Sequence, residues 1–583
     1  MRAKLRISAP LTDVFITIAV VGVVVVPLFA RSNGELDFVN HLWVVWAAGK
    51  ALVQAGHPTY FINTTTQGVF DPWFAFYGGT LYEATGAISE LIGHPYIAYT
   101  GVTVLGVAAS YAGTLWLGRQ FGLRGWIAHA PALTVVTGAY YITDLYGGAW
   151  TEFMPLSVIP PLVAGAVFLV RAPAWRPWPV LVFAVSVAIM TGSNDVTLVV
   201  SATAAVLVLV VMWLALGRPR RLPYRRFAMV AGLAVAAGLV NAWFLITDLL
   251  YARDVSISTT ATPVTGAVGS FDSAAFQFDP FRSWPSSSAF PGIYVQVPDW
   301  FLAWGVLAGA MLLWHRQARS GLRRAWIGGL ICFALLMGLI MDNSIWSVVP
   351  FPLDKVQFPF RLDIFVVYVV AGVVLAGALA LQHADVFERR RRNLKHLQVT
   401  LLAVTAISVG LCLWQELVPS DSVPGYFVNR RAAFVSPNVL PPSWYAVDPY
   451  NDIRAPIVAV PPGRVITIDP SRVSGDRFAG WVDAPPGPQP IQTNISGGDY
   501  VVRIAGLRRV GRSANGFAVV QRLKNGKGPV HIVISTAQTS AVAIGKILSL
   551  LAILTVLAIL TYTGVHARRA SRDKRADPER GLS

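Results

Sequence analysis

Long apolar runs alternate with short polar connectors along the whole chain, and this alternation constrains the fold more than any other feature of the sequence. In a bilayer every backbone amide must be hydrogen-bonded inside its own segment, so each span needs about 20 apolar residues in a helix. The composition agrees, because 54% of the residues are hydrophobic and only 13% are charged. Soluble proteins carry roughly 25% charged residues. The sequence therefore predicts an all-α polytopic membrane protein.

The positions of the apolar runs and of the basic residues predict the topology. Twelve spans are expected, near residues 12–30, 96–117, 126–142, 153–170, 178–192, 196–216, 227–247, 299–314, 325–341, 363–382, 398–416 and 541–565. With a cytoplasmic N-terminus, the inward segments hold 27 Lys and Arg residues and the outward loops before residue 417 hold only six. Because loops that stay in the cytoplasm are rich in Lys and Arg, we expect both termini to be cytoplasmic and the protein to lie in the plasma (inner) membrane.

The net charge of +17 has a plain explanation in this topology. The basic residues lie at helix ends on alternate sides of the apolar runs, which is typical of membrane orientation rather than of a nucleic-acid surface. We therefore expect no nucleic-acid partner. Cys332 and Cys412 fall inside apolar segments, so they build neither a disulfide framework nor a metal cluster.

The chain divides into four parts in this interpretation. Residues 1–416 form a transmembrane module with long outer loops at 31–95 and 248–298. A small extracytoplasmic β-rich domain follows at 417–540, then the last transmembrane helix at 541–565 and a basic cytoplasmic tail at 566–583. Alternating or β-branched stretches predict strands at 464–469, 499–504, 518–522 and 530–535. Asn525 and Gly526 favour a hairpin turn between the last two strands.

Candidate chemistry lies directly after the first helix, where Glu35, Asp37 and His41 fall within seven residues. If a helix begins near Asp37, Asp37 and His41 are four residues apart and share one face. A carboxylate there could act as a base on a hydroxyl group or hold a divalent cation. The alternative is that Asp37 caps an amphipathic helix and His41 reaches to the surface. An apolar stripe for the membrane interface is expected from Phe38, Leu42, Val45 and Trp46.

Aromatic residues and carboxylates continue through the first outer loop. Flat aromatic surfaces beside carboxylates suit sugar rings, whose C–H faces stack on Trp and Tyr. They suit an interfacial aromatic belt equally well. The candidates for substrate binding here are Trp43, Asp71, Trp73 and Tyr77.

Further charged groups are expected at the outer ends of helices. Lys355 and Arg361 are two of the six basic residues in the outward loops before residue 417, and a guanidinium is well made for gripping a phosphate with paired donors. Alternatively, Arg361 pairs with a nearby aspartate or with anionic lipid. Asp144, Glu152 and Asp195 are expected either to support the site or to cap helices, with capping favoured for Asp195.

These features together resemble the GT-C superfamily of integral-membrane glycosyltransferases. The resemblance rests on the acidic motif after the first helix, on the many further helices and on the soluble domain on the same outer side. The final part of the chain, from Gly497 through Ser549, resembles a bacterial branch with a β domain before the last helix. The segment 357–361, Gln-Phe-Pro-Phe-Arg, is similar to an outer-loop element of that branch, and the Ala/Val/Arg-rich helices are actinobacterial in character.

The resemblance implies transfer of a sugar from a polyprenyl-phosphate donor to a cell-envelope glycan or glycolipid acceptor outside the membrane. It implies that Asp37 is the catalytic carboxylate, with Glu35 as the near alternative. A single acidic residue is spaced before His41 in place of a clear Asp-x-Asp, so a divalent cation, Mg²⁺ or Mn²⁺, held by Asp37 and Glu35 is optional.

Two other functions compete with this interpretation. The first is a transporter or flippase of envelope lipid precursors, which often shows inverted repeats and buried charges along a path. No convincing repeat is present, and the acidic residues cluster at the outer ends of spans. The second is a non-catalytic scaffold for envelope assembly. The chain has no Walker A, Rossmann, HExxH or GxSxG motif, so any energy comes from an activated substrate or an ion gradient.

Overall fold

A computed structural model places most of the helices expected from the sequence. It describes residues 9–30, 33–34, 36–61, 69–70, 78–138, 141–142, 144–145, 148–172, 174–193, 201–202, 204–206, 209, 224–251, 305–306, 320–341, 363–384, 428–429, 464–469, 472–473, 476–495, 502–513, 517–523, 526–536 and 539–576. Within these ranges four helices are long and apolar enough to cross a membrane, or up to five if one bent pair counts as a span. The chain is therefore a membrane protein. The count of twelve stays a prediction, because the expected spans 196–216, 299–314 and 398–416 lie mostly or wholly outside the described residues.

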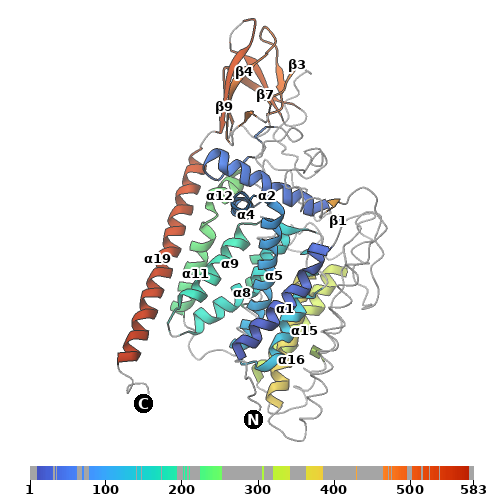
Figure 1. The fold of residues 1–583 in the computed structure, drawn as a ribbon, viewed down its shortest axis with the longest axis vertical. Coiled ribbons are helices and arrows are strands. Elements are labelled where there is room, and N and C mark those ends of the chain that lie inside the picture. Colours follow the sequence, from blue (N-terminus) through green and yellow to red (C-terminus); the bar gives the residue numbers. More distant parts are fainter. Residues whose placement is uncertain are drawn as a thin grey trace.

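The long helices coincide with the apolar runs. They are α1 (Ala9–Ala30), α5 (Pro95–Gln120), α8 (Trp150–Arg171), α9 (Pro177–Thr191), α11 (Tyr224–Leu239), α15 (Ser320–Met341), α16 (Asp363–Ala384) and α19 (Ser540–Ala576). Shorter helices connect them: α2 (Leu36–Ala55), α4 (Gly79–Ile92), η1 (Gly125–His129), α6 (Ala130–Val136) and α12 (Ala242–Tyr251). The first turn of α1 and the last turn of α19 lie at one end of the helical bundle, and the β strands lie beyond the opposite end (Figure 1). We call these the terminus end and the β-domain end.

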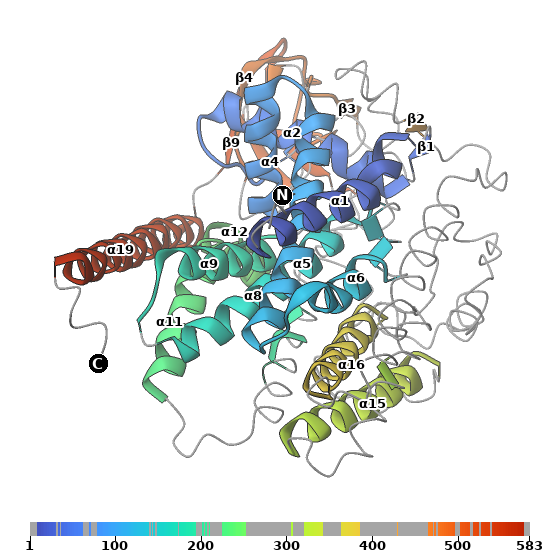
Figure 2. The ribbon, with the colours of Figure 1, turned by 60° about the horizontal axis from the view of Figure 1, so that its bottom comes forward.

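The central helix of the bundle is α8. In its most apolar stretch, 89% of the helix is buried inside the protein. It packs between α5 and α9, while α19 lies on one side of the bundle and α15 with α16 on the other (Figure 2). In the corresponding apolar stretches of α19 and α15, only 22% and 17% are buried. The exposed side chains of these two helices are apolar. Such surfaces are suited to lipid rather than to water.

The span predicted at 227–247 is interrupted, because α11 and α12 are bent by 80° at a short break. Asn241 lies fully buried in this break and donates to the carbonyl of Ala188 at 2.8 Å and to Oγ1 of Thr191 at 2.6 Å. The backbone N–H of Trp243 donates to Oγ of Ser549 in α19 at 2.9 Å. Side chains of neighbouring helices thus satisfy polar groups at the break, as a buried break requires.

The β domain, described between Arg464 and Thr536, consists of two small sheets. One has the order β3 (Arg464–Ile466), β5 (Ile491–Thr493), β8 (Ala518–Arg522), β7 (Leu507–Arg512), and the other β4 (Arg477–Val482), β9 (Val530–Thr536), β6 (Val502–Ala505). Because β8 and β9 belong to different sheets, the predicted hairpin between them is wrong. A further pair, β1 (Asn33–Gly34) with β2 (Val428–Asn429), joins the chain after α1 to a segment far along the sequence.

The first outer loop shares a hydrophobic core with the β domain. Phe61 and Phe70 from the loop and Phe244 from α12 are buried in one cluster with Ile491 and Ile534 of the two sheets. The backbone N–H of residue 69 also donates to the carbonyl of residue 494 at 2.7 Å. The β domain is therefore packed onto the helices rather than hanging from a single linker.

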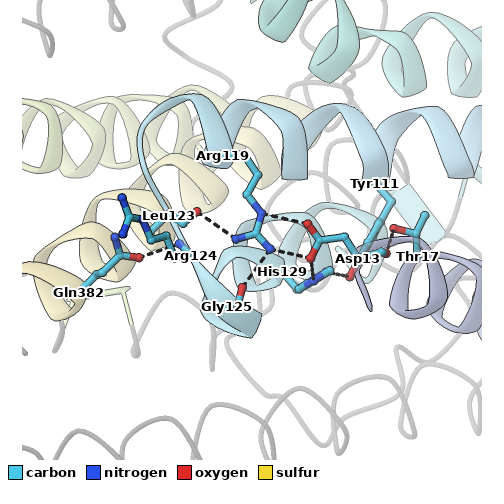
Figure 3. A network of polar contacts seen from close by, with 9 residues as sticks. All are labelled: Asp13, Thr17, Tyr111, Arg119, Leu123, Arg124, Gly125, His129 and Gln382. Carbon is cyan, nitrogen blue, oxygen red and sulfur yellow. Dashed lines mark hydrogen bonds and ion pairs between the residues drawn. The ribbon is translucent and has the colours of Figure 1, made fainter. Parts of the chain in front are cut away.

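A polar network ties four elements together near the terminus end (Figure 3). The guanidinium of Arg119 in α5 donates to both carboxylate oxygens of Asp13 in α1, at 2.6 and 3.1 Å. Nε2 of His129 lies 3.2 Å from the same carboxylate, and the Tyr111 hydroxyl lies 2.8 Å from Nδ1 of His129. Gln382 of α16 bonds two backbone groups of the turn after α5, at 2.6 and 2.7 Å. The network fixes α1 against α5, and so fixes the helix from which the first outer loop starts.

We expect Asp13→Asn to lower the thermal unfolding temperature of the purified chain. Hydrogen bonds to charged groups are worth about 1.5–3 kcal/mol each, and both partners here are about three quarters buried, with side-chain exposures of 24% and 26%. The matched control is Glu90→Gln, which removes a pair with Lys50 in which the lysine side chain is 47% exposed and the glutamate side chain 21%. Such an exposed pair contributes about 0–1 kcal/mol. Equal shifts in the two variants, measured by dye-detected unfolding in detergent, would contradict a stabilising role for the network.

Candidate functional site

The candidate site begins on α2, which lies across the β-domain end of the bundle (Figure 1). The helix begins at Leu36, so the expectation that a helix starts near Asp37 is confirmed. Asp37 is its second residue and lies one turn before His41. The structure describes the backbone of Asp37 but not its side chain, so the direction of the carboxylate stays a prediction.

His41 is buried, with only 5% of its surface exposed. Its Nδ1 lies 2.5 Å from the hydroxyl of Tyr82 in α4, and the two rings are stacked with centroids 6.0 Å apart. Burial lowers the pKa of His41 to about 3, so the imidazole is neutral at physiological pH. The alternative in which His41 reaches to the surface is therefore wrong, and His41 acts as an uncharged hydrogen-bonding group that holds α2 to α4.

The apolar stripe of α2 packs on protein and not on the membrane interface, which corrects the expectation for Phe38, Leu42 and Val45. Their exposed fractions are 2%, 1% and 0%. Trp43 is 3% exposed and contacts the ring of Trp46 at 6.4 Å between centroids. A ring as buried as Trp43 has no face open to a sugar, so in this structure it is a packing residue rather than the sugar-stacking surface that was predicted.

Close contacts with neighbouring segments hold the first turn of α2 in place. The Phe38 ring packs edge-on against Tyr96 and Tyr99 of α5, with centroids 6.0 and 5.4 Å apart. The Tyr96 hydroxyl also donates to the carbonyl of Leu28, near the end of α1, at 2.8 Å. Gly148 also contacts this turn, because a Cβ atom there would meet the backbone nitrogen of Phe38 at 2.5 Å, and its φ angle is +83°. Only glycine fits both requirements at this position.

Asp144 is a second acidic residue close to this turn. It is 5% exposed, and its backbone carbonyl accepts the N–H of Gly148 at 3.1 Å. Glu152 lies in the first turn of α8, and Asp195 falls outside the described residues. Asp144 is therefore linked through the backbone of Gly148 to the first turn of α2.

Sequence reasoning missed Glu83, a buried carboxyl group on α4. It is 5% exposed, and its Oε1 accepts the backbone N–H of Thr59 at 3.0 Å. Its Oε2 has no hydrogen-bond partner among the described residues. Burial raises the pKa of Glu83 to about 8, so the group is mostly protonated at neutral pH. Nothing in the local sequence distinguishes Glu83 from a surface glutamate, except that it follows Tyr82, which bonds His41.

The remaining candidates cannot be placed. Glu35, Asp71, Trp73, Tyr77, Lys355 and Arg361 lie outside the described residues. The binding of a phosphate by Arg361 therefore stays a prediction, as does a cation held by Asp37 and Glu35. Within the described part of the chain, no group of three or more His, Cys, Asp or Glu side chains is arranged to hold a metal ion.

Comparison with known proteins finds similarity in fold only. No family model matches the chain, and no curated protein matches its sequence. Among solved structures, it is similar to the arabinofuranosyltransferase AftD from Mycobacteria, with 17% identity, a TM-score of 0.44, and coverage of 72% of this chain and 29% of AftD. It is also similar to the oligosaccharyltransferase of Archaeoglobus fulgidus, with 12% identity, a TM-score of 0.39, and coverage of 78% and 62% of the two chains.

A third similar structure is ArnT from Cupriavidus metallidurans, with 12% identity, a TM-score of 0.37, and coverage of 70% of this chain and 76% of ArnT. The chain spans about three tenths of the length of AftD and about three fifths of the oligosaccharyltransferase. With every TM-score below 0.5, the comparisons assign neither a residue role nor a substrate to this chain.

We expect the stability of the chain to fall with rising pH because of Glu83. Between its ordinary pKa of 4.5 and the raised value of about 8, the folded chain holds a proton that the unfolded chain has released. Its contribution to stability is complete below the lower value and is lost as pH rises through the upper one. Glu83→Gln should therefore unfold at a temperature close to that of the wild type at about pH 4, and a few degrees above it at about pH 9.

The control for this measurement is Glu90→Gln on the same helix, which alters an exposed pair with Lys50 and should give no such gain at high pH. Parallel pH profiles for wild type and Glu83→Gln would show that the Glu83 carboxyl group is not held protonated by burial.

Proposed function

We propose that the chain transfers a sugar from a polyprenyl-phosphate-linked donor to a cell-envelope glycan or glycolipid acceptor, on the face of the membrane that carries the β domain. The observation that supports this best is the position of α2. A helix that begins with Leu36 and Asp37 lies across the β-domain end of the bundle, directly after the first membrane helix. A carboxylate on such a helix is next to the headgroup region, where a lipid-linked donor presents its phosphate.

In the proposed reaction Asp37 takes the proton of the acceptor hydroxyl. The acceptor oxygen attacks the anomeric carbon of the donor sugar, and the bond from that carbon to the phosphate oxygen breaks. The electron pair of that bond leaves with the polyprenyl phosphate. Arg361 is proposed to stabilise the released phosphate with paired hydrogen bonds, and Lys355 to add positive charge beside it. The neutral His41 holds the first turns of α2 in place through Tyr82.

The proposed orientation places the β domain outside the plasma membrane and both termini in the cytoplasm. It is supported by the basic inward segments of the sequence, and by the first turn of α1 and the last turn of α19 lying at the end of the bundle opposite the β domain (Figure 1). Membrane lipid is then the surrounding partner of α15 and α19, whose exposed side chains are apolar. A divalent cation, Mg²⁺ or Mn²⁺, would be an additional ligand of Asp37 and Glu35.

Transport of a lipid precursor is the second candidate, and the 80° bend between α11 and α12 is the observation that favours it. Broken helices line the substrate paths of many transporters. Here the break is filled by Asn241, which is bonded to α9 at 2.8 and 2.6 Å. The buried carboxyl groups of Glu83, Asp144 and Asp248 belong to segments near the β-domain end, and Asp13 near the other end is paired with Arg119. This arrangement favours a site at one face over a path through the bundle.

Replacement of Asp37 tests the proposal directly. We expect Asp37→Asn to lower sugar transfer by at least a factor of about 100, since loss of a general base costs about 10²–10⁴-fold. Transfer is measured with a radiolabelled polyprenyl-phosphate sugar and isolated envelope glycan as acceptor. The purified variant should keep the elution volume and unfolding temperature of the wild type. Wild-type transfer by Asp37→Asn would end the assignment of this residue.

Gly148 offers a test of positioning rather than of chemistry. A methyl group at 148 would lie 2.5 Å from the backbone nitrogen of Phe38 and would push the first turn of α2 away. We expect Gly148→Ala to lower kcat by about 100-fold, the effect of a displacement of about 1 Å, with a smaller change in KM. The matched control is Gly101→Ala in α5, where a Cβ atom meets nothing within 4 Å. Equal kcat values for Gly148→Ala and the wild type would show that the Gly148 contact does not position the site.

A further inference from the structure

The outer face of the sheet β4-β9-β6 carries an unusual set of exposed side chains. Alternate residues of β4 point outward, and Trp481 among them is 70% exposed. The residues between them, Phe478 and Val482, are buried at 4% and 9% exposure in the core of the domain. An indole ring left this open on a soluble domain has a large apolar surface that gains free energy when a ligand covers it.

The register of the strands arranges the outward side chains of this face in three rows. The first row is Arg477, Ser535 and Arg503, and the second is Ala479, Val533 and Ala505. The third row contains Trp481 opposite His531. Neighbouring rows are two residues apart along a strand, so the first and third rows are separated by about 13 Å. Two or three sugar units can lie between them.

The middle row gives the face its shape. Two alanines flank one valine there, so the side chains between the arginine row and the tryptophan row are short. We call this strip of short side chains, with the tryptophan row at one end and the arginine row at the other, the trough, and a flat ring can lie on it. His531 packs edge-on against Trp481, with ring centroids 5.2 Å apart, and so fixes the plane of the indole.

The opposite end of the trough is positively charged. Arg477 and Arg503 flank Ser535 from the two outer strands, and both belong to exposed positions. Strands two apart in a sheet are about 9.6 Å from each other, so the two guanidinium groups can grip separate acidic groups of one ligand. Asp483 is also exposed, but it follows Trp481 at the end of the trough away from the arginines.

From this arrangement we propose that the face formed by Trp481, His531, Arg477 and Arg503 binds an anionic glycan. One sugar ring stacks on Trp481, and carboxylate or phosphate groups of the same chain pair with the two arginines. This inference rests on the proposed function in one respect, because the glycan would be the acceptor of the transferred sugar. Charge complementarity favours an acidic glycan over a neutral one, and the open aromatic ring favours a sugar over a simple anion.

The position of the trough relative to α2 supports this role. Asp476, which directly precedes Arg477, lies 3.4 Å from Nε2 of His57, and His57 follows the end of α2 by two residues. The arginine end of the trough is therefore the end connected to the first outer loop. A glycan that is held on Trp481 and runs past the arginines would extend toward the β-domain end of the bundle.

The test is a direct binding measurement on the full-length chain in detergent. The probe is a short oligogalacturonide, an acidic glycan, and its fully methyl-esterified form is the neutral control. We expect Trp481→Ala and Arg503→Ala each to weaken binding of the acidic probe by about tenfold or more, as loss of a stacked ring or of a charge-assisted bond predicts. The neutral form should bind at least tenfold more weakly to the wild type. Binding of the acidic form should weaken as salt is raised.

Matched control variants lie in the same domain but away from the trough. Arg472→Ala removes an exposed guanidinium that pairs with Asp469 at 3.7 Å, and Leu523→Ala removes an apolar side chain that is 61% exposed. Both should bind the probe as the wild type does. Unchanged binding in Trp481→Ala and Arg503→Ala, or equal binding of the two probe forms, would overturn the proposal. Self-association of the wild type that Trp481→Ala abolishes, without any glycan binding, would overturn it in favour of a second copy of the chain.

The Asp37→Asn variant separates this inference from the proposed function, because it should bind the acidic probe normally. If the wild type binds the probe through Trp481 and Arg503 but transfers no sugar, the proposed function fails and the binding face stands. If sugar transfer depends on Asp37 while the trough variants bind and transfer normally, the binding face alone is wrong.

Discussion

The contact between Gly148 and the backbone of Phe38 is the constraint on which the candidate site depends. A helix that lies flat on the end of a bundle must approach other backbone closely, or it leaves a gap under its whole length. Gly148 supplies that approach at the first turn of α2, where a Cβ atom would lie 2.5 Å from the Phe38 nitrogen. Gly49 supplies it in the middle, where a Cβ atom would lie 2.6 Å from the carbonyl oxygen of Gly86 in α4. Between these two points α2 has little freedom to tilt, and the position of Asp37 along the bundle end follows from them.

Two buried groups, His41 of α2 and Glu83 of α4, are mostly uncharged at neutral pH, and this has a consequence for the chemistry near them. His41 is held neutral because burial disfavours the imidazolium, and Glu83 is held mostly protonated because burial disfavours the carboxylate. Neither group then offsets or competes with charges on a bound ligand. In surroundings of low polarity the attraction between a carboxylate, a phosphate and a guanidinium is less screened than in water. Uncharged buried groups at this place therefore leave the attraction between nearby charged groups stronger than it would be in water.

The sequence predicts the membrane helices better than the contacts between them. An apolar run long enough to span a bilayer marks α5, α8 and α19 without reference to the rest of the chain. The bend before α12 leaves no such signal, because the apolar run continues through Asn241 and the partner of that amide is on α9. The stripe of α2 was assigned to the membrane interface because an amphipathic pattern looks the same whether lipid or protein covers it. Tyr82, which bonds His41, is 41 residues away in the chain, and no local pattern announces that contact.

In the β domain too, local sequence predicts where strands lie but not which strands pair. The stretches at 518–522 and 530–535 are recognisable as strands from β-branched residues, and both are confirmed as β8 and β9. Their pairing was predicted wrongly, since a turn of favourable sequence does not decide which sheet each strand joins. β4 was missed because Ala479 and Gly480 dilute its pattern, although its outward Trp481 is the most exposed tryptophan of the described residues.

The shared core of the β domain and the first outer loop gives these separate parts a fixed geometry. Phe61 and Phe70 of the loop, Phe244 of α12 and Val542 of α19 are buried with the inner faces of both sheets. Movement of the β domain relative to α2 would expose several of these side chains, at about 1.5–3 kcal/mol for each one fully uncovered. The distance from the sheet face of Trp481 to the first turn of α2 is therefore set by packing. If the proposed glycan binds at one of these two places, it would meet the other at a constant number of sugar units, because the β domain and α2 keep a fixed separation.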